Sequence, residues 1–228
     1  MSEVAALARL DWVLAWRRGV IGAAAAVVLI YVTLLRVIPE AAASVVMPYL
    51  VFSDPAALGF FFVGGIVLAD RSEGTSAAVS VTPASPLAVL VGRVGALAAI
   101  GAVGGVAVAA GSGLSLRWFT FVPGVVLTAL LYTSFGYAVA LRARSVNDYF
   151  ARATVWSIPL FAPLVAVGFG IEERILALWP TTAALLLLGG GAFGPVAAVA
   201  LSVLAVGAAG VGWWALAELT AARREGRT

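Results

Sequence analysis

The segment Val67–Arg93, VLADRSEGTSAAVSVTPASPLAVLVGR, places a short polar stretch between two apolar ones. The first apolar run ends at Ala69, and the second resumes at Leu87. Plain connections between helices are often only about 2–8 residues long, whereas residues 70–86 stand between these two runs. The stretch can be read as a solvated loop whose charges only set topology. We instead expect a short helix, stopped by two prolines, that lies across one face of the protein.

The composition predicts a membrane protein. The chain is 63% hydrophobic and 11% charged, with a mean hydropathy of +1.08, whereas about one quarter of a soluble domain is charged. A spanning helix needs about 20 apolar residues, and the apolar runs do not alternate as barrel strands do. We therefore expect an all-α, polytopic integral membrane fold. The charge-free stretches are residues 19–35, 94–116, 118–141, 153–171 and 175–217.

The arginines predict the topology, because cytoplasmic loops carry an excess of positive charge. With six spans, eleven arginines fall on the cytoplasmic side and three outside, at Arg36, Arg117 and Arg174. Two crossings within 175–217 would instead give seven spans, and the arginine split favours six with both termini cytoplasmic. The expected segments are an interfacial piece at 1–18, spans near 19–38, 45–69, 87–110, 118–141, 153–170 and 195–217, the polar connection 70–86, and an outer re-entrant piece at 171–194.

Two segments leave alternatives open. An aspartate can cap a helix and proline suits its first position, so Asp54-Pro55 can begin the second span, or residues 44–53 can extend it with a kink. At the N-terminus, leucines at positions 7, 10 and 14 form one helical stripe and tryptophans at 12 and 16 another, although Asp11 lies near the leucines. We expect an interfacial helix there, rather than a frayed tail.

The sequence lacks residue types that several kinds of catalytic and binding site need. The chain has no cysteine and no histidine, and all 14 of its basic residues are arginine. Without a lysine there is no Walker A loop, so we expect no ATPase activity, no catalytic residues, no metal site and no cofactor in this chain, and no nucleic-acid partner. Arginine used to the exclusion of lysine suggests a bacterial genome, and hence the bacterial cytoplasmic membrane as the location.

Residues 58–93 resemble the permeases of the ABC-2 type family of ABC transporters. The family pattern is an acidic and a basic residue at the end of the second span, then Gly-Thr, then V-T-P, then a basic residue opening the third span. Here these are Asp70-Arg71, Gly74-Thr75, residues 81–83 and Arg93. The acidic residue is usually Glu, so Asp70 is a departure. FSDPAALGFFFVGGIVL (52–68) and RSVNDYF (144–150) resemble the drug (fluoroquinolone-type) export permeases.

This resemblance implies a function for the opening segment. Residues 70–86 would be a coupling helix that sits in a groove of a separate ATPase subunit, which binds the ATP and Mg²⁺. Two permease chains, identical or related, would pair in the membrane. The expected coupling residues are Asp70, Arg71, Glu73, Gly74, Thr75, Arg142, Arg144, Asn147 and Asp148.

The resemblance also implies a path for the cargo along the second and fifth spans. Aromatic side chains there would suit a hydrophobic or amphipathic compound, although the same residues could simply pack or face lipid. They are Phe60, Phe61, Phe62, Trp156 and Phe161. Export of a lipid-linked glycan or haem remains a rival interpretation within transport. A membrane scaffold without transport, or a membrane enzyme, would be a rival of another class.

Overall fold

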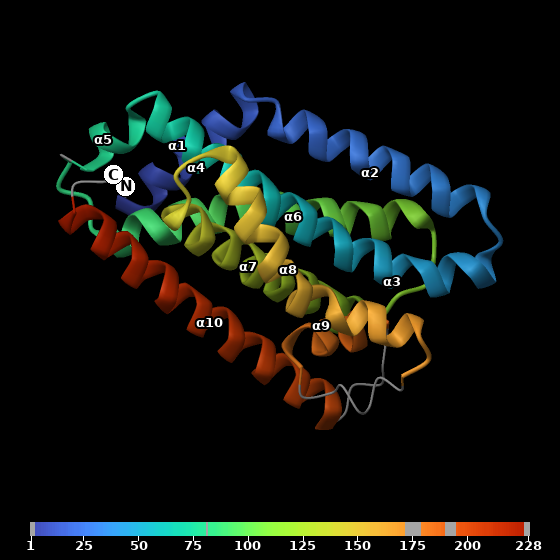
Figure 1. The fold of residues 1–228 in the computed structure, drawn as a ribbon. Coiled ribbons are helices and arrows are strands. Elements are labelled where there is room, and N and C mark those ends of the chain that lie inside the picture. The colour runs from blue at the N-terminus through green and yellow to red at the C-terminus, as the bar shows by residue number, and fades with distance from the viewer. Residues whose placement is uncertain (1–2, 81, 172–178, 190–194, 226–228) are drawn as a thin grey trace.

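A computed structural model describes residues 3–80, 82–171, 179–189 and 195–225 (Figure 1). Every regular element in these residues is helical, which confirms the predicted all-α class for this part of the chain. In chain order the elements are α1 (Glu3–Arg17), α2 (Val20–Val37), α3 (Glu40–Ala56), the π-helix η1 (Ala57–Phe61), α4 (Phe62–Ser72), α5 (Thr75–Ser80), α6 (Pro86–Ser112), α7 (Trp118–Arg142), α8 (Val146–Gly168), α9 (Pro180–Leu188) and α10 (Pro195–Arg224).

Five of these helices are long and apolar enough to cross a membrane, namely α2, α6, α7, α8 and α10. Two of them form the centre of the bundle, because most residues of α6 and α7 are buried whereas most of α2, α8 and α10 are not. α7 packs against α6, α9 and α10, and also against the α3–α4 run. The outer helices therefore leave long apolar faces uncovered within one chain, as expected of surfaces that meet lipid or another membrane helix.

The second apolar segment is a continuous helical run over residues 40–72, made of α3, η1 and α4. Residues 44–53 belong to it, and the helix starts at Glu40 rather than at Pro55, which lies near the end of α3. Proline lacks the N–H for an i→i−4 hydrogen bond, and prolines and single π turns are both places where a long helix departs from regular α geometry. η1 also lies very close to α7: a Cβ added to Gly136 would meet the carbonyl oxygen of Phe60 at 2.6 Å.

The two ends of the described chain meet at one end of the bundle (Figure 1). The Glu3 carboxylate accepts a hydrogen bond from the backbone N–H of Ser85 at 2.5 Å. The Arg223 guanidinium donates to the carbonyl of Ala84 at 3.0 Å. The start of α1 and the end of α10 therefore lie on the same side as the polar connection before α6. At the opposite end, Arg36 donates to the carbonyl of Gly111 at 2.7 Å.

The expected re-entrant piece is only partly described, because residues 172–178 and 190–194 lie outside the described ranges. Within it, α9 has nine residues, far fewer than the roughly 20 that a crossing needs. Ala183, Ala184 and Leu187 on this helix are buried, and it packs against α3, α7, α8 and α10. Protein therefore covers this short helix, as a non-spanning segment at membrane depth requires.

Candidate functional site

The polar connection folds as a tight turn and a short helix. α4 ends at Ser72, and Gly74 adopts a left-handed φ of 72°, a conformation that glycine reaches without steric cost. The six-residue α5 follows. Ser85 then caps α6 by accepting from the N–H of Ala88 at 3.1 Å, with Pro86 at the first position, the arrangement favoured at a helix start. The expected short helix is present, over Thr75–Ser80.

Asp70 lies inside the protein rather than on its surface. Its side chain is fully buried between two arginines from other elements. One carboxylate oxygen is 2.9 Å from a guanidinium nitrogen of Arg18, and the other is 2.5 Å from one of Arg93. A buried carboxylate is costly unless it is paired with positive charge, and here it has two cations. Asp70 therefore ties α4 to α6 and to the link between α1 and α2.

Two further carboxylates extend this arrangement. Arg93 also pairs with Asp11 of α1 at 3.0 Å, and Arg18 pairs with Glu73 at 2.7 Å. Burial raises the pKa of Asp11 above its ordinary value, although the facing Arg93 opposes that rise. We call these five residues the ion cluster: Asp11, Arg18, Asp70, Glu73 and Arg93. They form an unbroken alternation of charge from the interior to the surface, where only the outermost member, Glu73, is more than half exposed.

Arg71 joins the two polar connections. Its guanidinium donates to the carbonyl of Leu141 at 2.8 Å and to that of Ala143 at 2.6 Å. The last carbonyls of a helix lack partners within the helix, so Arg71 satisfies the end of α7. This contact fixes the turn after α4 against the α7–α8 connection. The two segments in which coupling residues were expected are therefore one connected surface.

The start of α8 is built around Asp148. This carboxylate accepts from the backbone N–H of Arg144 at 2.9 Å and from the Arg152 guanidinium at 2.8 Å. Its own N–H is held by the Ser145 hydroxyl at 3.2 Å. Arg142 pairs instead with Glu218 of α10 at 2.6 Å. Five of the expected coupling residues are exposed to solvent, namely Glu73, Gly74, Arg142, Arg144 and Asn147. Thr75 and Asp148 are half-buried.

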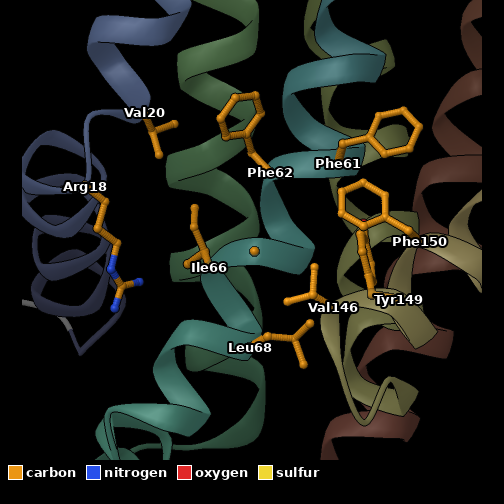
Figure 2. Close-up of a pocket in the computed structure, with 10 residues that line it drawn as sticks. Arg18, Val20, Phe61, Phe62, Ile66, Leu68, Val146, Tyr149 and Phe150 are labelled. Carbon is orange, nitrogen blue, oxygen red and sulfur yellow. The ribbon is translucent and has the colours of Figure 1, made fainter.

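A pocket of about 390 Å³ opens beside this region (Figure 2). Its wall comes from η1, α4 and α8, with Arg18 and Val20 on one side. Phe61 and Phe150 lie nearly parallel, with ring centroids 6.2 Å apart and planes inclined by 21°. The lining is otherwise aliphatic or aromatic, and the guanidinium of Arg18 points away from the phenylalanines (Figure 2). Such a pocket can hold a flat apolar group.

Only part of the expected aromatic path lines the pocket, although successive ring contacts of 5.1, 6.2 and 5.4 Å join Phe61, Phe60, Phe135 and Trp156. Phe61 and Phe62 line the pocket, whereas Phe60 is fully buried. Phe161 packs edge-on against Phe52 in the core at 6.2 Å. Trp156 lies against Phe135 at 5.4 Å. Two of the five expected aromatic residues therefore line the pocket, together with Tyr149 and Phe150. Tyr149 and Phe150 belong to the segment RSVNDYF, which resembles export permeases, but no role was predicted for them.

Sequence reasoning also missed the ion cluster as a unit. Asp11 was noted as a charge near the leucine stripe, and Arg93 as the basic residue that opens the third span. Neither was interpreted as part of a buried pair, because 82 positions separate them and their pairing is visible only in the fold. No three His, Cys, Asp or Glu side chains gather as a metal site among the residues described.

The fold defines a multi-helix protein with five helices long and apolar enough to cross a membrane. The match to known families is more specific: the fluoroquinolones export permease protein family matches residues 2–221, and the chain belongs to this family. Two relatives from Mycobacterium tuberculosis, strains CDC 1551 / Oshkosh and H37Rv, carry the name "Fluoroquinolones export permease protein". Each is 34% identical over 191 residues, covering 83% of this chain and 81% of the relative.

Proposed function

We propose that this chain is the membrane subunit of an ATP-driven exporter for a hydrophobic or amphipathic compound, with ATP hydrolysed on separate ATPase subunits. The observation that carries the proposal is the course of one helix. Phe62 and Ile66 of α4 line the pocket, Asp70 anchors the same helix in the ion cluster, and Gly74 lies exposed at its end. A force applied at the exposed turn would reach the pocket through fewer than four helical turns.

The inward contacts give the coupling residues two different roles in this proposal. Glu73, Gly74 and Arg144, with Asn147, are exposed and would meet the ATPase subunit. Asp70 and Arg71 would act as positioning residues, because their partners are Arg18 and Arg93 or the end of α7. Arg71 makes the two loops move together. Since α4 and α8 both begin or end at this surface and both line the pocket, its displacement would alter the width of the pocket.

The pocket supports an aromatic, largely apolar cargo. The stacked pair Phe61 and Phe150 offers a flat wall, and offset stacking of rings is worth about 0.5–1.5 kcal/mol beyond burial. The relatives are named for fluoroquinolones, and a compound with a fused aromatic ring would suit this wall. Without a buried unpaired charge in the lining that the structure describes, selection would rest on shape and apolar area.

The membrane arrangement of the proposal has six crossings, formed by α2, the α3–α4 run, α6, α7, α8 and α10. An even number is supported by the meeting of α1 and α10 at one end, which the excess of arginine assigns to the cytoplasm. The location would be the bacterial cytoplasmic membrane. Exposed apolar residues such as Val206 (73%) and Ile158 (66%) leave room for lipid and for a second permease chain, identical or related.

The test is transport by the chain reconstituted with its ATPase subunits in proteoliposomes. Phe62→Ala should weaken cargo uptake and cargo-stimulated ATP hydrolysis while leaving assembly intact. Phe169→Ala is the matched control, since Phe169 is 84% exposed and lies just beyond α8, away from the pocket. If the ATPase subunits never bind the chain, the exporter assignment fails. If they bind, but both variants transport like the parent, this pocket is not the cargo site.

Gly74→Trp tests the coupling surface separately. No side chain lies within 4 Å of a Cβ at Gly74, but its left-handed φ disfavours any larger residue. The variant should lose both assembly and transport. If it assembles and transports normally while lesions in residues 142–152 abolish both, the main coupling element is the α7–α8 connection instead.

A further inference from the structure

Helix α1 has two sharply different faces. Leu7, Asp11 and Ala15 face the protein. Leu7 lies very close to α6, because a Cβ added to Gly92 would be 2.9 Å from the Cβ of Leu7. The opposite face carries Trp12 and Trp16, exposed to 43% and 69%. Tryptophan and arginine together are typical of helices at the headgroup level of a membrane. The exposed face of α1 therefore has the composition of a lipid-contacting surface.

An apolar groove of about 420 Å³ begins under this helix. Trp12 covers one end, and the walls are α2 and α6. Small side chains create the space, with Ala25 on α2 and Gly104 and Ala107 on α6. The groove opens outward rather than into the core, because Leu29 and Val103 on its rims are 67% and 63% exposed. Its long axis follows membrane-crossing helices, so an extended hydrocarbon chain would fit along it.

An exposed cation on α1, Arg9, is close in sequence to Trp12, although it does not itself line the groove. Arg9 lies three residues before Trp12, on the same exposed face of α1 by helical spacing. Within the part of the chain that the structure describes, no carboxylate pairs with Arg9. Arg17 is also exposed, but helical geometry puts it on the other edge of the exposed face, away from Trp12. The groove therefore combines an apolar slot with one available guanidinium beside its indole cover.

We propose that this groove is a binding site for an anionic phospholipid, with one acyl chain along α2 and α6 and the phosphate held by Arg9. The pairing of Asp11 with Arg93 would keep Trp12 over the chain, because it fixes α1 on α6. The site is distinct from the cargo pocket, which is formed by α4 and α8. The bound lipid would in turn hold α1 in place, since its head and its tail contact different helices.

The test uses the full chain, purified in dodecyl maltoside and depleted of native lipid, titrated with dioleoylphosphatidylglycerol or dioleoylphosphatidylcholine by native mass spectrometry. Ala25→Leu should fill the groove and weaken binding of both lipids, and Ala107→Leu should repeat the effect from the other wall. Ala26→Leu is the matched control, because Ala26 is exposed on the same helix but does not line the groove.

The headgroup is tested with a second matched pair. Arg9→Gln should weaken phosphatidylglycerol binding about fivefold, the share of one basic residue at the headgroup level, and leave phosphatidylcholine unchanged. Arg17→Gln should change neither by more than about twofold. Equal losses for both arginine variants would show diffuse surface attraction and overturn the site. Unchanged lipid binding in both Ala25→Leu and Ala107→Leu would also overturn the site. If these two variants instead lost self-association, the groove would be a contact between two copies of the chain and not a lipid site.

Discussion

Replacing Asp70 with Asn tests whether the ion cluster holds the cytoplasmic end of this permease together. The substitution keeps the shape of the side chain but removes the negative charge that pairs with both Arg18 and Arg93. Removing one partner of a buried pair costs about 3–5 kcal/mol, because the other charge stays buried. Arg93 retains Asp11 and Arg18 retains Glu73. We therefore expect the lower limit, a loss of about 3 kcal/mol in the free energy of unfolding.

For a chain of this size, 1 kcal/mol shifts the melting temperature by about 2–4 °C, so Asp70→Asn should melt about 6–12 °C below the parent. The assay is loss of the monodisperse peak in size-exclusion chromatography after heating in detergent. Glu73→Gln is the control, because Glu73 is 56% exposed and exposed pairs contribute about 0–1 kcal/mol. If Asp70→Asn melts with the parent, or if Glu73→Gln costs as much, the cluster does not act as a buried anchor.

Three further predictions follow from separate contacts. Gly64→Ala should lower the melting temperature, because its Cβ would overlap the ring of Tyr149, whereas Gly65→Ala has open space and should melt with the parent; a similar loss for both would contradict this packing. Arg71→Ala should speed hydrogen exchange at the end of α7, because it frees two carbonyls, and unchanged exchange there would refute that role. Cysteines placed at Leu114 and Arg224 of this cysteine-free chain should be labelled from opposite sides of the membrane; labelling of both from outside intact cells would rule out six spans with cytoplasmic ends.

The features that depend on composition could be predicted from the sequence. Long charge-free runs indicated helices of spanning length, and α2, α6 and α7 begin and end close to the expected positions. The two prolines of the polar connection indicated a short helix over about residues 71–81; the structure has the helix α5 at Thr75–Ser80, while Arg71 belongs to α4 and Gly74 separates the two helices. These signals are local, because caps, breakers and apolar length act within one or two turns. The start of the second span was left open between Asp54-Pro55 and the stretch 44–53, and the helix begins before both, at Glu40.

The missing features depend on contacts between distant residues. Asp70 looked like a surface charge because its neighbours in sequence are polar, yet Arg18 and Arg93 bury it. Arg71 likewise turns inward to a helix end 70 positions away. The pocket could not be predicted because it depends on how α8 packs against the η1–α4 run. That packing brings Phe150 to Phe61, while Phe161 packs in the core. The sequence of one helix alone does not determine how it packs against another.

The π-helix η1 sets the rotational phase of everything after it in the second span. A π turn is equivalent to one residue inserted into an α-helix. If the same residues continued as a regular α-helix without the π turn, the far half would be turned by about 100°, the rotation per residue of an α-helix. That rotation would carry Asp70 away from Arg93 and Phe62 away from the pocket, although no residue had changed. Deleting one residue within 57–61 would instead remove the residue that the π turn absorbs, so the run could become a regular α-helix with α4 in its present orientation. A single-residue gap at η1 is therefore compatible with every contact of α4.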